Sequence, residues 1–453
     1  MPWDHAMNVQ DKVFRGGCVL TLSDVRPEPL IADLWIRDGK IEAIGTIPDL
    51  QDAEQVDASG RILMPGLVNA HQHCWQTAMR GVAGNSSLPS YLQTVHRKLA
   101  PKMTPEDMRI SGLTAALNQL ACGTTTIGDW CHNIPTADHV DAAIEGLASS
   151  GIRAVFFHGF PPAGPNGTAA DITTLSHSKD ALLRVLQGPL RQAGGLIDLG
   201  IAVLGPHYSI KDVAVADLTL AGELGLIASM HHSGGPARSP DGWEEVKMRQ
   251  LLGPHVNIVH GNSFSDEELR SLIEFGVSFT VTPEVEMSAG HGEPITQRLL
   301  ALGSSPSLGV DIESGISAEM VNVARFALAQ QRAAAHAAAK TLGEPFATQL
   351  FSTSREALIW ATKRGAQALG LDQRVGELSE GMQADIIMIN PSDLNLAAAH
   401  DPYWTALNSS SHNIEAVLVN GEWKKKKGQL VGVDQAELLQ KLEASRSRLV
   451  GED

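Results

Sequence analysis

Two histidines separated by one residue, His71 and His73, follow the apolar run 63–70. In an extended strand, side chains alternate between faces, so these two imidazoles point the same way while Gln72 points the other way. Two imidazoles at one strand end can hold a divalent cation, which lowers the pKa of a bound water to about 7 and makes hydroxide available at neutral pH. The pair therefore predicts a metal site able to activate water.

The elements that must position this pair are strands that alternate with helical stretches. The candidate strands are 63–68, 124–127, 154–157, 201–204, 227–230, 256–259, 277–281 and 307–310. The stretches 321–340 and 354–369 have the pattern of amphipathic outer helices. Strands that alternate with helices imply parallel β/α units, and eight such units close into a barrel. The sequence thus predicts an α/β fold with a TIM-like (β/α)8 barrel.

Polar residues directly follow several of these predicted strands, where the active sites of such barrels lie. They are His207, His231, His232, His260 and Asp311. With the first pair they place several imidazoles and a carboxylate around one mouth, which is the ligand set of a catalytic zinc or iron site. Because neighbours on a strand face opposite ways, only one of His231 and His232 can coordinate the metal.

Short β-type runs broken by turn residues occupy the two ends of the chain. They fill 12–62 and return in 386–389 and 414–419, the last of which is followed by Asn420-Gly421, a strong hairpin signal. We expect the ends to form one composite β-sandwich domain, residues 1–64 plus 371–453, beside the hydrolase barrel of residues 65–370.

Composition and charge limit the classes of partner. The 453 residues are 43% apolar and 19% charged, with a formal charge of -16, which fits a globular enzyme and opposes binding to nucleic acid or an anionic membrane. The four cysteines, at 18, 74, 122 and 131, form no disulfide framework. The N-terminus shows no signal segment, and no apolar run is long enough to span a bilayer. We expect a cytoplasmic protein with a small-molecule substrate.

Several motifs, in this order, carry a resemblance to a known family. They are Pro65-Gly66-Leu67-Val68-Asn69-Ala70-His71-Gln72-His73 with its continuation to Arg80-Gly81, Cys122-Gly123-Thr124-Thr125-Thr126, the strand-end His231 and His260, Gly309-Val310-Asp311, Ala361-Thr362-Lys363-Arg364-Gly365-Ala366 and Gly381-Met382-Gln383-Ala384-Asp385. The chain resembles the amidohydrolase superfamily, in the branch of cytosine-deaminase-like, aminohydrolase and chlorotriazine-hydrolase (ATZ/TRZ-like) enzymes. The resemblance covers nearly the whole length.

The resemblance implies roles for the strand-end residues. The metal ligands would be His71, His73, His231 and Asp311, with one divalent metal per chain, zinc first and iron as the alternative. His260 would be a further ligand or contact the metal-bound water. Asp311 would act as general base on that water and then pass the proton to the leaving group. His207 resembles the substrate-binding histidine of the family.

One position departs from the family pattern. Deaminases of this branch carry a glutamate three residues after the fifth-strand histidine, where it protonates the ring nitrogen, and here that position is Gly234. The loss of a general acid costs about 10²- to 10⁴-fold in rate. Either Glu284 or Glu286, after the seventh strand, replaces it as a substrate-contacting acid, or the substrate is an amide, lactam or imide that needs no such acid. The plain alternative is that both glutamates face solvent.

Aromatic side chains near the mouth offer further contacts. Trp75 and Trp130 could stack on a planar ring, and so could His132 and His158, although all four could equally be packing. His291 lies between glycines on a loop that could close over substrate.

The leading hypothesis is a metal-dependent hydrolase of non-peptide carbon–nitrogen bonds (EC 3.5.-.-, with 3.5.4.- favoured). It would be deaminase-like, with a metal-bound hydroxide attacking a small N-heterocycle and Asp311 as base. The alternatives are hydrolysis of a cyclic amide, imide or amide, a chlorohydrolase, and, more remotely, a non-catalytic binding protein. Homodimers are common among relatives, so a homodimer is also an expectation.

Overall fold

The computed structural model describes residues 10–160, 171–350 and 352–451. The first nine residues, on which the expectation about a signal segment and the start of the predicted N-terminal domain fall, lie outside these ranges. Within the described residues, no helix is both long and apolar enough to cross a membrane.

Eight parallel strands form a barrel in chain order. They are β6 (Leu67–Gln72), β7 (Thr124–Cys131), β8 (Arg153–His158), β9 (Ile197–Ala202), β10 (Ile227–His232), β11 (Val256–His260), β12 (Ser278–Val281) and β13 (Ser307–Leu308). The barrel closes just beyond β13, where the Asp311 N–H donates to the His71 carbonyl at 2.9 Å and the His73 N–H donates to the Asp311 carbonyl at 2.8 Å. The predicted barrel is thereby confirmed.

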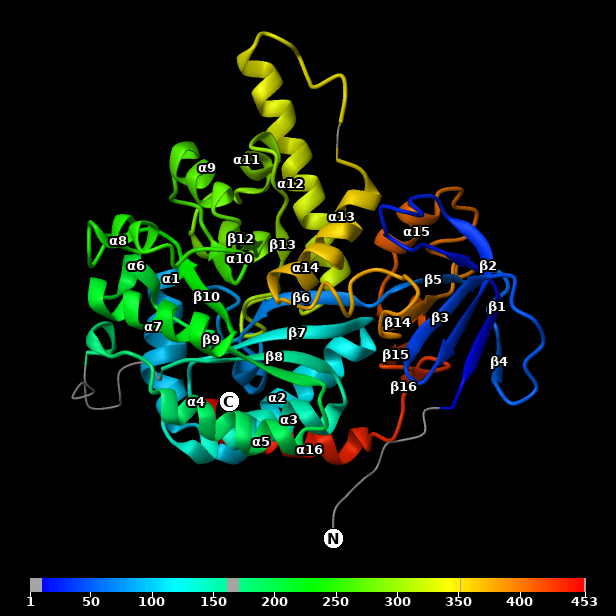
Figure 1. The fold of residues 1–453 in the computed structure, drawn as a ribbon, viewed down its shortest axis with the longest axis horizontal. Coiled ribbons are helices and arrows are strands. Elements are labelled where there is room, and N and C mark those ends of the chain that lie inside the picture. The colour runs from blue at the N-terminus through cyan, green and yellow to red at the C-terminus, as the bar shows by residue number, and fades with distance from the viewer. Residues whose placement is uncertain (1–9, 161–170, 351, 452–453) are drawn as a thin grey trace.

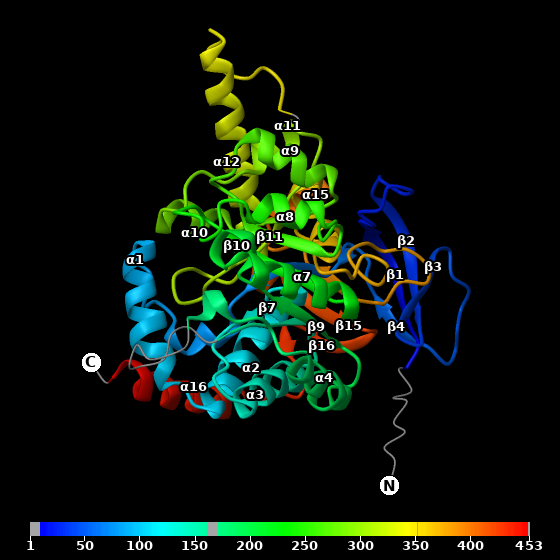
Figure 2. The ribbon, with the colours of Figure 1, turned by 60° about the vertical axis from the view of Figure 1, so that its left-hand side comes forward.

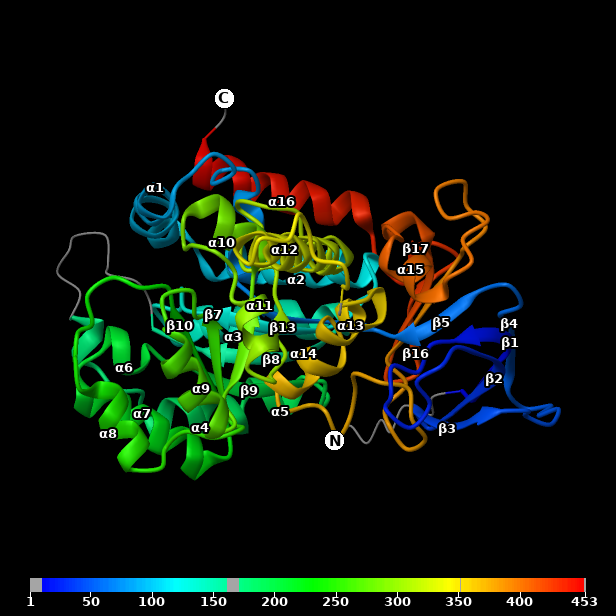
Figure 3. The ribbon, with the colours of Figure 1, turned by 90° about the horizontal axis from the view of Figure 1, so that it is seen from above.

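Helices surround the barrel, as Figures 1 and 2 show. They are α1 (Leu88–Tyr91), α2 (Pro105–Ala121), α3 (Ala137–Ser150), α4 (Lys179–Gln187), α5 (Pro189–Gln192), α6 (Gly205–Tyr208), α7 (Lys211–Leu224), α8 (Gly242–Met248), α9 (Asp266–Glu274), α10 (Pro283–Ala289), α11 (Thr296–Ala301), α12 (Met320–Thr341), α13 (Ser354–Trp360), α14 (Lys363–Ala368), α15 (Pro402–Leu407) and α16 (Gln435–Val450). The local sequence determines where several helices begin. For example, α2 begins with a capping box between Thr104 and Asp107, which satisfies free N–H groups of its first turn. The end of α12 projects from the body, and α16 packs along α2 (Figure 3).

A second, nine-stranded sheet combines both ends of the chain, which lie side by side in Figure 1 as blue and orange segments. Its strands are β1 (Lys12–Val19), β2 (Leu30–Arg37), β3 (Lys40–Gly45), β4 (Glu54–Asp57), β5 (Ile62–Pro65), β14 (Ile386–Ile389), β15 (Ile414–Val419), β16 (Glu422–Lys426) and β17 (Gln429–Leu430). The expected hairpin joins β15 to β16, with positive φ at Asn420 and Gly421 as a type I′ turn requires. Phe14, Ile386 and Leu418 share its apolar core.

The predicted strand 63–68 is wrong as a single element. It divides at Gly66 into β5 of the small sheet and β6 of the barrel, because the two halves pair with strands of different sheets. A Cβ at Gly66 would overlap the side chain of Thr125. Pro65 still pairs with Ile386 in the small sheet. The exact bounds of the two domains stay a prediction.

Two further elements differ from expectation. The predicted helix 354–369 is two helices, α13 and α14, because Thr362 between them has φ -135° and ψ -88°, outside the helical region. The fourth barrel strand lies at 197–202 instead of 201–204, since its last apolar residues lead into α6.

A buried ion pair ties the barrel to the small sheet. Arg153 of β8 donates to both carboxylate oxygens of Asp385, just before β14, at 2.9 Å each. Both side chains are almost fully buried. Asp385 also accepts the Asn420 N–H of the hairpin at 2.8 Å, so one carboxylate joins three segments.

Candidate metal centre and active-site cavity

Four side chains that the sequence singled out converge at the carboxyl end of the barrel. His71, His73, His231 and Asp311 each offer one ligand atom, and these atoms all lie within 4.8 Å of one another. The Nε2 atoms of His71 and His231 are 3.2 Å apart. Oδ1 of Asp311 lies 3.4 Å from Nε2 of both His71 and His73. We call these four residues the metal cluster.

The protonation states of the metal cluster favour a bound cation. Burial lowers the pKa of all three histidines, that of His73 to about 3. Burial alone would raise the pKa of Asp311, but its hydrogen bond with His71 and the neighbouring imidazoles lower that pKa instead. The cluster therefore holds three neutral imidazoles and one carboxylate at neutral pH.

The donor atoms fit a divalent metal. Nδ1 of His73 lies 2.7 Å from the Trp130 carbonyl. Since a carbonyl only accepts, this nitrogen carries the proton and Nε2 is free to coordinate, the arrangement usual for metal-bound histidine. The Nε2 atoms of His71 and His231 face one another within 3.2 Å. Three imidazole nitrogens and a carboxylate are an established donor set for zinc.

Strand alternation allows only one of His231 and His232 to face the metal cluster, and it is His231, the residue that the resemblance implied. His231 joins the metal cluster, whereas the His232 ring stacks on Phe264 with the centroids 3.6 Å apart and the planes 7° from parallel. Nδ1 of His232 lies 3.2 Å from the Ser263 hydroxyl. His232 thus faces away from the metal cluster.

His260 lies beside the metal cluster and is oriented by Glu286. Its Nδ1 is 3.2 Å from Oε1 of Glu286, and its Nε2 is 3.9 Å from Oδ2 of Asp311. Burial lowers the pKa of His260, but the Glu286 hydrogen bond and the charges of Asp311 and Glu286 outweigh burial and raise it. His260 and Asp311 both have positive φ, 72° and 69°. Such backbone strain in non-glycine residues clusters at functional sites.

A cavity of about 480 Å³ opens beside the metal cluster. It is lined by His73, Leu88, Tyr91, Leu92, His96, Trp130, His132, Tyr208, His231, Ser233, Gly234, Gly235, His260, Val285, Ala289, His291, Asp311 and Ile312. Its volume lies within the range typical of small-molecule sites. Of the five residues predicted to bind substrate, Trp130 lines this cavity.

The other four predicted substrate-binding residues do not line the cavity. Trp75 is buried behind His132, with ring centroids 5.4 Å apart. His207 turns toward His232, with ring centroids 4.6 Å apart. Glu286 is fully buried behind His260, and Glu284 lies elsewhere on α10, where burial raises its pKa.

The remaining candidate histidines separate into two groups. His132 and His291 line the cavity, with their rings 4.7 Å from His73 and 4.4 Å from His260, respectively. His158 does not line it. Gly234 lies in the wall and brings no side chain.

One wall of the cavity comes from the segment around α1 and was not predicted from the sequence. Tyr91 and His96 are joined by a 2.8 Å contact between the Tyr91 hydroxyl and Nε2 of His96, and the same hydroxyl accepts from Gln76 at 2.6 Å. This segment follows no strand directly, so strand ends gave no signal for it. Tyr208 was also missed, although it stands next to His207 in the sequence.

A closed parallel barrel with a metal cluster at the carboxyl ends of its strands is an arrangement that can activate water for hydrolysis. The chain belongs to the amidohydrolase family, whose model, described as "Amidohydrolase family", matches residues 62–424. It is a metal-dependent, deaminase-like hydrolase of carbon–nitrogen bonds.

Similar proteins span nearly the whole chain. An 8-oxoguanine deaminase of Pseudomonas aeruginosa is 28% identical, covering 92% of this chain and 94% of its own. A 5-methylthioadenosine/S-adenosylhomocysteine deaminase of Symbiobacterium thermophilum is 27% identical, covering 86% and 88%. Among solved structures, zinc-complexed atrazine chlorohydrolase of Arthrobacter aurescens TC1 has a TM-score of 0.83 at 23% identity, covering 96% of this chain and 99% of that one. The solved structure shares the fold.

Proposed function

We propose that this protein is a zinc-dependent deaminase of a small, neutral N-heterocycle. Water would replace an amino group on a ring carbon, giving a carbonyl and ammonia. The observation that carries the proposal is the metal cluster, which forms one wall of a cavity of heterocycle size. The deaminases among the similar proteins support the same reaction type.

The metal would be held by His71, His73, His231 and Asp311. When bound, a divalent metal lowers the pKa of a water molecule to about 7 and so supplies a nucleophile at neutral pH. Zinc is the proposed metal because it prefers nitrogen donors with a carboxylate in such open sites, and iron is the alternative.

Asp311 and His260 would manage the protons. The Asp311 carboxylate, kept ionised by the neighbouring imidazoles, accepts a proton from the attacking water and passes it to the leaving amine. His260, held at Nδ1 by Glu286, directs Nε2 toward Asp311. Glu286 acts through His260 and is therefore a positioning residue in this proposal.

The cavity wall favours an uncharged, planar substrate. No lysine or arginine is among the described residues that line the cavity, and the sequence of 161–170 contains no charged residue. Trp130 offers an aromatic face on which a ring can stack. The Tyr208 hydroxyl is already engaged, donating to the Gly234 carbonyl and accepting from the Ser233 N–H at 3.0 Å each. Apart from the metal, the described residues of this wall offer no lysine or arginine to pair with a phosphate or carboxylate on the substrate.

Hydrolysis of a cyclic amide or imide is the second candidate. The position of the usual ring-protonating glutamate is Gly234, whose φ is 96°, and its carbonyl is engaged by Tyr208. An amide carbonyl needs only polarisation and one proton transfer through Asp311. This reaction would open the ring without releasing ammonia.

Metal analysis combined with product analysis tests the proposal. Purified protein should contain about one zinc per chain, and the loaded enzyme should release ammonia from an aminated heterocycle. Ring opening without ammonia would favour the amide hydrolase, and chloride release would favour the chlorohydrolase. Loaded protein without any of these turnovers would contradict the proposal and favour a non-catalytic binding protein. Light scattering on the same sample tests the expected homodimer.

A further inference from the structure

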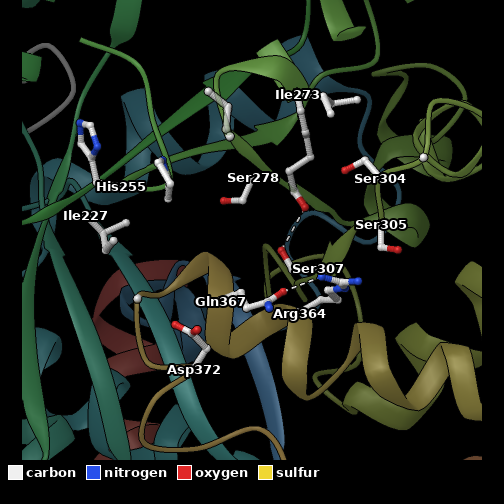
Figure 4. Close-up of a pocket in the computed structure, with 16 residues that line it drawn as sticks. Ile227, His255, Ile273, Ser278, Ser304, Ser305, Ser307, Arg364, Gln367 and Asp372 are labelled. Atoms are coloured by element: carbon white, nitrogen blue, oxygen red, sulfur yellow. Dashed lines mark hydrogen bonds between the residues drawn. The ribbon is translucent and has the colours of Figure 1, made fainter. Parts of the chain in front are cut away.

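A second large cavity lies at the opposite end of the barrel from the metal cluster (Figure 4). Its volume is about 570 Å³. Ile227, in its wall, begins β10, the strand that carries His231 near its other end. Ser307, also in its wall, begins β13, after which Asp311 follows. The two cavities are therefore separated by the length of the barrel strands, and a ligand in this one cannot contact the metal cluster.

Arg364 supplies the positive charge of this cavity. Its guanidinium donates one hydrogen bond, to Oε1 of Gln367 at 2.8 Å. Its Nε is buried and has no hydrogen-bond partner in the structure as described, and no described carboxylate lies within ion-pair distance of the guanidinium. Asp24, whose pKa is lowered in part by Arg364, is instead bound by Lys363 at 2.8 Å. Buried donors without partners are rare in native proteins and call for an explanation.

The wall near Arg364 offers further donors. Ser304 and Ser305 line the cavity, and no hydrogen bond engages their hydroxyls within the described part of the chain. A guanidinium is always charged and presents planar N–H groups that match the oxygens of a carboxylate or phosphate. This part of the cavity has the chemistry of an anion site.

The other side of the cavity carries the opposite charge. In Figure 4, Gln367 lies between Arg364 and Asp372. The Asp372 carboxylate accepts a hydrogen bond only from its neighbour Gln373 among the described residues, at 3.1 Å. Ile227, Ile273 and Phe279 supply apolar surface in the same cavity. Around its apolar wall the cavity thus has one cationic side chain, Arg364, and one anionic side chain, Asp372, at separate points. Neither forms an ion pair within the described residues.

We propose that this cavity is a binding site for a small zwitterion. The anionic group of the ligand pairs with Arg364 and the hydroxyls of Ser304 and Ser305, while its protonated amine pairs with Asp372. Arg364 and Asp372 balance in charge, so a ligand with one charge of each sign neutralises both without adding net charge. Both a carboxylate and a phosphate could be the anionic group, because a guanidinium binds the oxygens of either. Probes that carry one or the other distinguish between them.

Binding of defined probes to the full, metal-loaded chain tests the site. The probes are glycine, 4-aminobutyrate and 6-aminohexanoate, which vary the charge separation, and O-phosphoethanolamine, which replaces carboxylate by phosphate. Acetate, inorganic phosphate and propylamine serve as single-charge controls. For at least one zwitterion we expect a saturable heat of binding and a melting temperature of the protein that rises with probe concentration. The single-charge fragments of that zwitterion should bind with lower affinity. Absence of saturable binding by every probe would overturn the proposal.

Paired variants locate the site. Arg364→Met should lower the affinity for the tightest-binding probe by about tenfold or more, as expected for loss of a charged partner. Asp372→Asn should remove the preference for the zwitterion over acetate or phosphate. Arg270→Met makes the same charge change on the exposed surface of α9 and should bind the probe normally. If Arg364→Met melts at a lower temperature than wild type, Ser305→Ala provides an independent test, because loss of this hydroxyl should also decrease the affinity for the probe. Binding that survives in Arg364→Met and Asp372→Asn but disappears in His231→Ala would place the probe at the metal cluster and refute the assignment.

Discussion

Nδ1 of His260 lies 3.2 Å from Oε1 of Glu286, and the same carboxylate oxygen accepts the Thr282 N–H at 2.8 Å. Because Glu286 is held by the backbone at the start of α10, it holds the His260 ring with Nε2 toward Asp311. A buried carboxylate behind an active-site imidazole sets both the tautomer and the orientation of the ring.

Glu286→Gln should lower kcat by about 10- to 100-fold, the range found when such supporting partners are changed. Metal content should stay near the wild-type value, because Glu286 is outside the metal cluster. The matched control is Glu284→Gln, two positions away and half-buried on the same helix. Equal losses of kcat in both variants would contradict the positioning role.

Adjacent histidines on β10 should differ in metal binding. His231→Ala should lose the metal, as measured by mass spectrometry of chelator-free preparations, because it removes one of four ligand atoms. His232→Ala should keep the metal and lose its stacking on Phe264 and its contact with the Ser263 hydroxyl, at a cost of about 1–3 kcal/mol in unfolding free energy. Retention of metal by His231→Ala would contradict the proposed ligand set.

Asp311→Asn should reduce turnover by about 10²- to 10⁴-fold, since an amide cannot accept the proton from water. The fold should persist, because asparagine tolerates the left-handed backbone of this position, where φ is 69°. Circular dichroism and metal analysis serve as controls. Wild-type turnover in this variant would mean that another group is the base.

Stability should depend on pH through Asp129. Burial raises the pKa of Asp129 to about 7, whereas an unfolded aspartate has a pKa of about 3.9. Between these two pKa values the folded chain binds more protons than the unfolded chain. The contribution of protonated Asp129 to the free energy of unfolding is therefore fully present below about pH 4 and is lost as the pH rises through 7. In metal-free protein, Asp129→Asn should gain urea stability relative to wild type between pH 4 and 8, by at most about 4 kcal/mol. Asp138→Asn, on the exposed start of α3, should show no such trend.

The junction between the barrel and the small sheet should be sensitive to Asp385→Asn. This variant leaves the buried Arg153 guanidinium without its counter-charge, which costs about 3–5 kcal/mol in unfolding free energy. The matched surface change, Asp141→Asn, removes the partner of Arg184 from a half-exposed pair and should cost below about 1 kcal/mol. Denaturant unfolding measures both, and similar losses would contradict the role of burial.

The barrel and the gathering of polar strand ends at one mouth could be predicted from local periodicity, whereas the choice of the four metal ligands among them came from the resemblance to the amidohydrolase superfamily. Strand alternation placed His71 and His73 on one face and opposed His231 to His232, and the barrel topology then brought distant strand ends to one mouth. The order of the eight apolar runs sufficed to predict the sheet. None of these inferences needed a long-range contact to be known in advance.

The parts that could not be predicted depend on tertiary packing. The division at Gly66 depends on pairing in two different sheets, β5 with β14 and β6 with β7. Tyr91 and His96 reach the cavity because their segment docks over the barrel mouth, which no local pattern encodes. Glu284 and Glu286 were expected to follow the seventh strand as substrate contacts, with exposure to solvent as the alternative. Pro283 instead begins α10, and residues two apart on a helix point to different sides. The Thr-Pro pair before them was a helix-start signal that was overlooked.

The seam that closes the barrel also has a consequence for how the enzyme matures. The Asp311 backbone bonds with His71 and His73 across the seam, and the adjacent Val310 N–H bonds to the Asn69 side chain, 241 positions earlier in the chain. Closing a loop of this length costs chain entropy, which must be overcome before these contacts can form. The four metal ligands come together only when this seam has closed. A bound metal therefore stabilises the closed barrel selectively, because an open chain has no complete metal centre.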